Sequence, residues 1–180
     1  FCTHLHVDHV GWNTRLENEP LAPTFPNAKY IIGKSEFGYW LRWNKKFGPH
    51  PSRPSFEECV STIVEADPAI LVNDDFELND LIHHYPAPGH TPGQCCASLS
   101  SNGAKAIFAR DALHHPLQVF EPQWSTSKFE DPKMAIVSRR KNFESCTDTE
   151  TILIPAQFLG KTVGKVYSAS DKFSFKFIEK

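Results

Sequence analysis

The sequence predicts a layered α/β domain. Helix-like patterns alternate with short strand-like patterns along the chain, and two strand-like segments in the second half meet at a turn dipeptide. Because helices must cover the faces of a sheet to bury its apolar side chains, this mixture favours layers of helix and sheet. The 180 residues, 40% of them hydrophobic, suffice for one core and are too few to argue for two. We therefore expect a single domain over residues 1–180.

The first half of the chain begins with an alternating pattern. Residues 1–8 are expected to be extended, with one apolar face and one face that carries Cys2, His4, His6 and Asp8. Prolines indicate a loop over residues 20–26, and the apolar run at 30–32 fits a buried strand. This part of the sequence therefore predicts two short extended segments joined by a loop.

Two helices are expected next. Trp40, Trp43 and Phe47 fall at helical spacing, which predicts a helix over residues 35–47. Core packing is the favoured role of these aromatic side chains, and walling a pocket is the alternative. Ser55 and Glu58 form a capping-box pattern for a second helix that ends near residues 67–68.

The second half contains the clearest hairpin signal. Residues 94–100 and 104–110 read as strands joined across Asn102 and Gly103, a dipeptide suited to the positive φ angles of a tight turn. Residues 151–155 read as a buried strand, and the alternating phenylalanines of 173–177 as a last strand with one apolar face.

A further helix is expected between these strands. Asp131 and Pro132 are typical of an N-cap and a first helical residue, and the helix should run to about Phe143. The basic run 139–141 near its end is explained by the helix dipole.

The composition and the net charge limit the classes of molecule that the protein is expected to bind. The formal charge of −2 comes from mixed acids and bases without a long basic run, which argues against nucleic acid and anionic membrane surfaces. No apolar run approaches the roughly 20 residues that span a bilayer, and the first residues carry no signal pattern. Five cysteines without regular spacing do not suggest a disulfide framework. We expect a small-molecule partner and a cytoplasmic location.

The segment HLHVDH carries the strongest chemical signal. It packs three imidazoles and a carboxylate into six residues, a cluster too polar to bury unless a metal compensates it. Imidazole and carboxylate are suitable ligands for zinc, and the two-residue spacing of His4 and His6 aims both at one point. The side chains of the consecutive residues Asp8 and His9 are expected to point in different directions. This suits the binding of two ions about 3.5 to 4 Å apart.

This segment, extended by Val10-Gly11-Trp12-Asn13, resembles the signature loop of the metallo-β-lactamase superfamily. Two later landmarks agree in order and spacing. The loop 88–93 resembles the one that carries a third histidine, here His90, and Asp111 resembles the carboxylate that bridges two metals. Taken alone, His90 would be an ordinary turn histidine and Asp111 a strand-end cap.

The resemblance implies an αββα sandwich of which this chain matches roughly the later two thirds, so we expect a member whose first sheet portion is missing. It implies metal ligation by His4, His6, Asp8, His9, His90, Asp111 and Gln157. Position 157 departs from the family pattern, which normally has a histidine there, and Arg110 stands where glycine is usual. Gln157 should hold a second ion weakly, so the site could carry one or two ions of zinc, with iron or manganese as alternatives.

Four further histidines attract attention. The pairs 83–84 and 114–115 are conspicuous, but the family pattern requires none of them as a ligand. We expect His115 to contact a metal-binding side chain without binding the metal itself, and the other three to be surface or packing residues.

The activity implied by the resemblance is hydrolysis by a metal-bound hydroxide, with Asp8 as the catalytic group that orients it. The longer match resembles a subgroup of lactonases and organophosphate hydrolases, which favours a lactone or other ester as substrate. Trp40 and Trp43 would wall an apolar substrate site. Alternatives are a mononuclear thioesterase or sulfur dioxygenase on the same fold, and a degenerate homologue without activity. A homodimer is left open.

Overall fold

The structure is a computed structural model that describes residues 1–17, 20–48 and 56–179. It divides into two compact units, Phe1–Asp74 and Asp75–Lys180, and each is described by itself. Both combine helices with strands, so the predicted α/β class is confirmed. The prediction of one domain over residues 1–180 stays a prediction.

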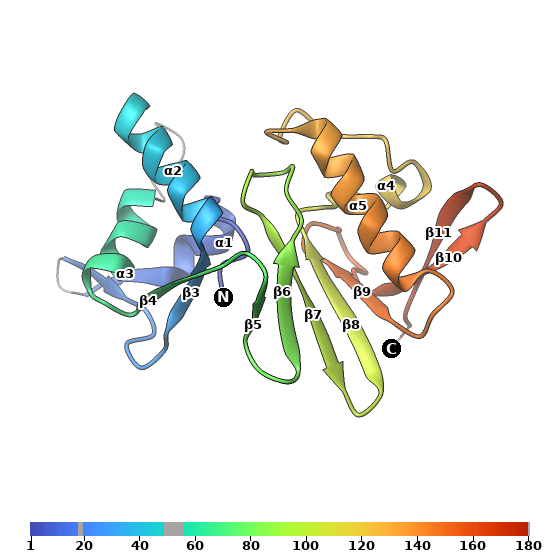
Figure 1. The fold of residues 1–180 in the computed structure, drawn as a ribbon, viewed down its shortest axis with the longest axis horizontal. Helices are drawn as coiled ribbons and strands as arrows, with labels where there is room; N and C mark the ends of the chain where they lie inside the picture. The colour runs from blue at the N-terminus through green and yellow to red at the C-terminus, as the bar shows by residue number, and fades with distance from the viewer. Residues whose placement is uncertain (18–19, 49–55, 180) are drawn as a thin grey trace. The chain divides into compact units, whose positions relative to one another are not determined.

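The first unit is built around short strands and helices (Figure 1). A hairpin pairs two antiparallel strands, β1 and β2, and a parallel pair joins β3 to β4. The elements are α1 (Val7–Val10), η1 (Gly11–Asn13), β1 (Thr14–Leu16), β2 (Leu21–Pro23), β3 (Tyr30–Gly33), α2 (Lys34–Phe47), the π-helical turn η2 (Phe56–Ser61), α3 (Thr62–Glu65) and β4 (Ala69–Val72). The predicted strand at 30–32 and helix at 35–47 are therefore confirmed. Ser55 of the predicted capping box lies outside the described residues, and a helical stretch follows it.

The core of this unit confirms the packing role of Trp40 and Trp43, whereas Phe47 is 60% exposed and lies outside the core. Trp40 is 6% exposed and belongs to a buried cluster with Ile32, Val60 and Ile63. Trp43 packs against this cluster from its edge. Because Trp40 is buried, it forms part of the core rather than an open wall.

The expected extended conformation of residues 1–8 is only partly right. The backbone of Cys2 does form a parallel β-bridge with that of Ile32 in β3. After His6, however, the chain turns and enters the helical turn α1. The carbonyl of His6 accepts hydrogen bonds from the backbone N–H groups of His9 and Val10, which closes that turn. The period-two pattern therefore ends at His6, and Val7, expected on the apolar face, is 47% exposed.

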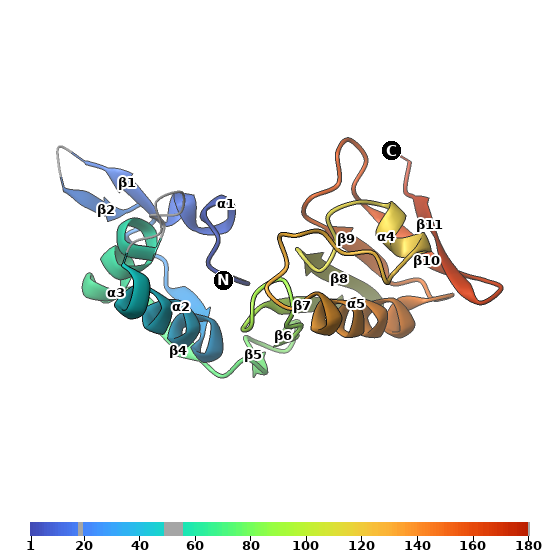
Figure 2. The same cartoon turned by 90° about the horizontal axis from the view of Figure 1, so that it is seen from above.

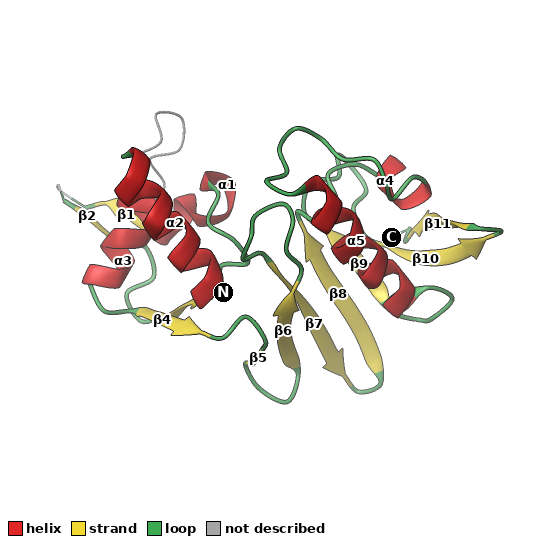
Figure 3. Ribbon diagram, turned by 45° about the horizontal axis from the view of Figure 1, so that its top comes forward, coloured by secondary structure: helices red, strands yellow, loops and turns green. Residues whose placement is uncertain are grey.

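The second unit is organised by one sheet (Figures 1 and 3). Its seven strands lie in the order β11-β10-β9-β8-β7-β6-β5 and are antiparallel except for the pair β8 and β9. The elements are β5 (Phe76–Glu77), β6 (Ile82–Pro86), β7 (Cys95–Ser101), β8 (Ala104–Arg110), α4 (Leu117–Phe120), α5 (Pro132–Cys146), β9 (Ile152–Pro155), β10 (Gly164–Ala169) and β11 (Lys172–Phe177). The predicted hairpin and the two later strands are confirmed.

Local chemistry explains the hairpin. Asn102 and Gly103 have φ angles of 50° and 81°, so both occupy the left-handed region that a tight two-residue turn requires. Asparagine and glycine tolerate that region better than other residues do.

Helix α5 lies along one face of this sheet (Figures 2 and 3). It starts as predicted, because Asp131 is its N-cap and accepts a hydrogen bond from the backbone of Met134 at 2.9 Å. It ends at Cys146, and Phe143 and Cys146 pack in a buried cluster with Ile107 and Leu153 of the sheet. The helix thus supplies one side of this unit's core.

The helix-dipole explanation for the basic run is wrong for Arg139. This side chain is fully buried and donates hydrogen bonds to three carbonyl groups, while the last turn of α5 contains no basic residue. Sequence could not separate it from Arg140, whose side chain is 48% exposed, because the difference lies in which helix face meets the protein.

All five cysteines are buried, and none forms a disulfide with another. In the part of the chain that the structure describes, every helix is too short or too polar to cross a bilayer.

Candidate metal centre

The first unit gathers three imidazoles of the motif. The ring centroid of His4 lies 4.8 Å from that of His6 and 4.1 Å from that of His9. His4 is fully buried, and His6 is 8% exposed. Burying three imidazoles together is unfavourable unless a ligand or hydrogen bonds compensate them, so the cluster suits metal binding.

Glu36 of helix α2 fixes the backbone beneath these histidines. Its Oε1 atom accepts the backbone N–H of Leu5 at 2.9 Å and the indole N–H of Trp40 at 2.8 Å. Leu5 lies between His4 and His6, and the ring of His6 meets Trp40 edge to face at 5.6 Å. Glu36 is only 1% exposed, so this carboxylate links the motif to the unit's core. Sequence reasoning missed Glu36, because only the fold shows that this helical position faces the motif.

Asp8 has a different setting. It lies on the exposed turn α1, its side chain is 55% exposed, and its carboxylate is 3.4 Å from Nε2 of His9. The carboxylate is thus accessible to solvent and to a small molecule.

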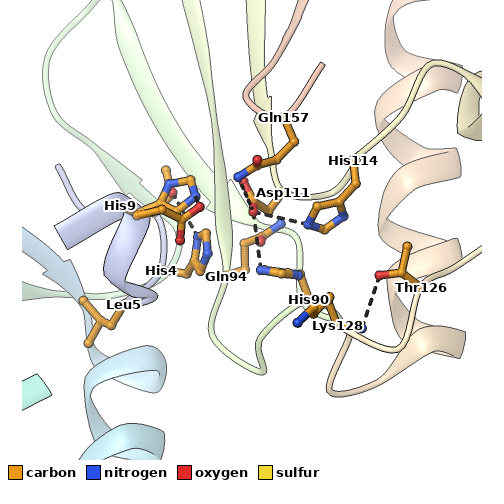
Figure 4. Close-up of polar contacts among 12 residues, drawn as sticks. His4, Leu5, His9, His90, Gln94, Asp111, His114, Thr126, Lys128 and Gln157 are labelled. Carbon is orange, nitrogen blue, oxygen red and sulfur yellow. Dashed lines mark hydrogen bonds and ion pairs between the residues drawn. The ribbon is translucent and has the colours of Figure 1, made fainter. Parts of the chain in front are cut away.

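The second unit gathers two histidines around Asp111 (Figure 4). Asp111 Oδ2 lies 3.5 Å from Nε2 of His90 and 3.4 Å from Nε2 of His114. These three side chains offer ligand atoms that all lie within 4.8 Å of one another. The side chains of His90 and Asp111 are each 3% exposed, and that of His114 is 20% exposed. Within this unit, His90 and Asp111 meet as the sequence predicted.

The loop that carries His90 is held by the N-cap and the N-terminal half of α5. Ser138 donates to the carbonyl of Pro88 at 2.7 Å, and the backbone N–H of Asp131 donates to the carbonyl of Gly89 at 2.9 Å. Gly89 has a φ of 136°, and a Cβ atom there would lie 2.2 Å from the backbone nitrogen of Ala135. Only glycine permits this approach, which explains the Pro-Gly-His sequence of the loop.

Asp111 follows an irregular strand end. The register between β8 and β9 shifts between Phe108 and Arg110, and Arg110 has a φ of 49°. A left-handed conformation favours glycine, so Arg110 strains the backbone directly before Asp111. Arg110 therefore does not lie on a regular stretch of strand.

Gln157 lies beside the same carboxylate. Its Nε2 atom donates a hydrogen bond to Asp111 Oδ2 at 3.0 Å, and Figure 4 shows its amide directed at that oxygen. The sequence placed Gln157 near the bridging carboxylate, and the structure brings the two together.

The sequence did not select His114. It packs as expected, with its ring 4.9 Å from that of His90 and edge to face with Phe129 at 5.0 Å, but this packing places it beside Asp111. His115, expected to support a ligand, is exposed instead, and its Nδ1 accepts the backbone N–H of Leu117. The sequence signal that could have separated His114 from His115 is its spacing of three residues from Asp111.

His84 is a buried histidine outside these clusters. Burial lowers the pKa of its imidazole from 6.5 to about 4, and the nearby charges of His83 and Arg110 act in the same direction. His84 therefore stays neutral near neutral pH.

The family model of the metallo-β-lactamase superfamily matches residues 1–152. The chain belongs to the metallo-β-lactamase superfamily. No curated protein sequence matched it.

Solved structures of this superfamily share the fold. The chain superposes on the dizinc quorum-quenching lactonase AidC, crystallised with its product, with a TM-score of 0.80 at 23% identity, over 99% of this chain and 63% of that one. The hydrolase AbOPH gives 0.79 at 23% identity, over 99% and 63%. A probable metal-dependent hydrolase from Staphylococcus aureus gives 0.79 at 18% identity, over 99% and 61%. At these identities the likeness shows the fold alone, and the chain spans about 60% of these structures' length.

The donor atoms of this superfamily member fit divalent ions. Ligand atoms about 2.0 to 2.1 Å from a tetrahedral zinc ion lie roughly 3.3 Å from one another. The spacings of 3.5 Å and 3.4 Å around Asp111 Oδ2 match that value. Zinc and similar divalent ions bind well to nitrogen and carboxylate donors such as these buried side chains.

Proposed function

We propose that this chain carries the metal centre of a hydrolase that holds two divalent ions, zinc in the first place. The observation that carries the proposal is the buried Asp111 carboxylate with two imidazole nitrogens at ligand-to-ligand distance. In the proposed arrangement His4, His6 and His90 bind one ion. Asp8, His9 and Asp111 bind the other, Asp111 is shared between the ions, and Gln157 lies beside it.

Divalent ions bound there would polarise the scissile group and lower the pKa of water from about 15.7 towards roughly 7. The chain's own residues would do the rest. Asp8, accessible on its turn, would orient the attacking water and accept its proton. The Glu36 link would keep His4 and His6 in place during turnover, because it ties their backbone to a buried helix.

We propose a lactone or another carboxylic ester as the substrate. The described relatives support this choice, since AidC is named as a lactonase and AbOPH as a hydrolase. A small-molecule substrate also agrees with the near-neutral charge. The cytoplasmic location and a homodimer stay predictions.

A panel of substrates tests the proposal. Zinc-loaded protein is assayed with an N-acyl homoserine lactone, an aryl ester, an aryl phosphotriester and a thioester. We expect the lactone or the aryl ester to be cleaved fastest, with at least a roughly 100-fold loss in Asp8→Asn and Asp111→Asn, the scale of one general-base contribution. His115→Ala, on an exposed side chain outside the centre, is the control and should keep its rate. No cleavage of any substrate by protein that holds metal would contradict the hydrolase.

One observation supports a second candidate. Gln157 directs an amide N–H at Asp111, a group that cannot bind a cation, so a mononuclear thioesterase or sulfur dioxygenase is the alternative. One ion per chain together with thioester cleavage, or with oxygen uptake on a persulfide substrate, would favour it.

A further inference from the structure

The proposed ligand set leaves His114 without a role, although it lies in the same cluster as Asp111 and His90. We propose that His114 is itself a metal ligand, binding through Nε2 one of the two ions that share Asp111. This inference rests on the proposed metal centre and adds an imidazole that the sequence did not predict.

The distances favour direct ligation. Nε2 of His114 is 3.4 Å from Asp111 Oδ2, which is too long for a good hydrogen bond and close to the separation of two ligands on one tetrahedral ion. Nε2 of His90 is 3.5 Å from the same oxygen. Two nitrogens that surround one carboxylate oxygen at ligand spacing leave room for an ion among the three donors.

Gln157 occupies a different role at this carboxylate. Its amide N–H donates to Asp111 Oδ2 at 3.0 Å, a normal hydrogen-bond length. A carboxylate that binds metal commonly accepts such a hydrogen bond as well, which orients it. Gln157 therefore acts as a positioning residue for Asp111, and the nitrogen ligand comes from His114.

The backbone at His114 is fixed in advance of metal binding. Oε1 of Gln118 accepts the backbone N–H of His114 at 2.7 Å and that of His115 at 3.2 Å. Nε2 of Gln118 donates to the carbonyl of Trp124, which also accepts a hydrogen bond from Arg139. Gln118 is 4% exposed, so this frame is buried. A ligand held on a rigid buried frame loses little entropy on binding an ion.

Packing sets the direction of the ring. Phe129 meets the ring of His114 at 5.0 Å with an interplanar angle of 89°, and meets His90 at 5.3 Å with 83°. The guanidinium of Arg139 lies over the Phe129 ring, with its carbon 5.4 Å from the ring centroid. One aromatic side chain thus supports both imidazoles next to Asp111.

The neighbouring histidine provides a matched control. His115 is exposed, and its Nδ1 accepts the backbone N–H of Leu117. It is therefore next to His114 in the sequence but lies outside the cluster around Asp111. Variants at 114 and 115 therefore differ chiefly in whether they reach the metal.

Cobalt spectroscopy of the cysteine variants tests the proposal. His114→Cys and His115→Cys are prepared in the full chain, stripped of metal and titrated with Co²⁺. A thiolate bound to cobalt produces a near-ultraviolet charge-transfer band that imidazole does not. We expect this band in His114→Cys, and no change from the unsubstituted protein in His115→Cys.

Zinc affinity supplies a second readout. Loss of a group behind a ligand costs about 10–100-fold in metal affinity, so loss of a ligand should cost roughly 100-fold or more for one of the ions. We expect this loss in His114→Ala, measured by competition with a chelating dye. Adding Gln157→His to His114→Ala should restore part of it, because an imidazole then returns beside Asp111. Far-ultraviolet circular dichroism checks that each variant is folded.

The outcomes separate this inference from the proposed function. If folded His114→Cys gives no charge-transfer band and His114→Ala keeps its zinc affinity while His4→Ala loses metal, the centre exists and His114 is not its ligand. If the unsubstituted protein binds no zinc, or His4→Ala changes nothing, the proposed centre is wrong and the inference falls with it.

Discussion

The guanidinium of Arg139 donates its Nε hydrogen bond to the carbonyl of Ala112 at 2.8 Å, one residue after Asp111. The same side chain also donates to the carbonyls of Pro122 and Trp124. Burial lowers the pKa of Arg139 to about 10, so the group remains charged at neutral pH. A buried cation without a carboxylate partner in the described part of the chain is held here by three carbonyl dipoles, and it closes the loop that carries His114.

Arg139→Met should therefore destabilise the protein strongly. The substitution keeps much of the side-chain volume but leaves the carbonyls of Ala112 and Pro122 without this donor, at about 1–3 kcal/mol for each buried group left unsatisfied. The carbonyl of Trp124 keeps its hydrogen bond from Gln118. We expect the free energy of unfolding to fall by about 3–5 kcal/mol, measured by urea denaturation. The control is Arg140→Gln on the exposed face of the same helix, where the 3.8 Å pair with Glu144 should contribute less than about 1 kcal/mol. Equal losses in both variants would show that the buried hydrogen bonds contribute nothing specific.

Glu36→Ala should weaken the metal motif from a distance. It removes the acceptor for Leu5 N–H and for the Trp40 indole, both buried, so we expect a loss of about 2–4 kcal/mol in unfolding free energy. Zinc affinity should fall as well, because His4 and His6 flank Leu5. Glu36→Gln retains one carbonyl oxygen at this position and should recover most of both properties. Zinc affinity unchanged in Glu36→Ala would mean that the histidines are positioned without this carboxylate.

Arg110→Gly should stabilise the protein. A left-handed backbone costs a residue with a Cβ atom about 1–2 kcal/mol, and glycine removes that cost at the price of some unfolded-state entropy. We expect a net gain of about 0.5–1 kcal/mol, seen as a higher melting temperature. Arg110→Ala removes the charge but keeps the strain, so it should give no gain. Equal stabilisation by alanine and glycine would assign the effect to the charge of Arg110.

His84 should make the metal-free protein less stable in acid. Its pKa is about 4 when folded and 6.5 when unfolded, so the unfolded state binds more protons between these values. Its contribution to stability is therefore present in full above pH 6.5 and declines as the pH falls towards 4. At pH 5 the loss should be about 2 kcal/mol relative to pH 8. His84→Asn, which does not titrate, should flatten this part of the urea-denaturation profile; an unchanged slope would assign it to other groups.

Local patterns predicted those parts of the fold that depend on neighbours in sequence. Asn102 and Gly103 specify their turn through their own φ preferences, and Asp131 with Pro132 specifies a helix start. The strand pattern of residues 1–8 failed because hydrogen bonds to the His6 carbonyl, which side-chain alternation does not register, close a helical turn at Val7.

Sequence motifs named several candidate ligands that the structure brings together within each unit. His90 and Asp111 were found in this way, and they do lie together. Glu36, His114 and Arg139 were missed or misread, because each makes its decisive contacts with residues distant in sequence. Glu36 contacts Leu5, His114 contacts His90 and Phe129, and Arg139 contacts Ala112. Such contacts follow from the tertiary structure and leave no local pattern.

Metal stoichiometry measured on single and double variants tests the central claim most directly. In the proposed arrangement, His4, His6 and His90 bind one ion. Elemental analysis of the unsubstituted protein should give two zinc ions per chain. His4→Ala and His90→Ala should each remove the same ion, so the double variant should hold no less metal than either single variant. Losses that add in the double variant, or a chain that binds no metal at all, would contradict a shared centre.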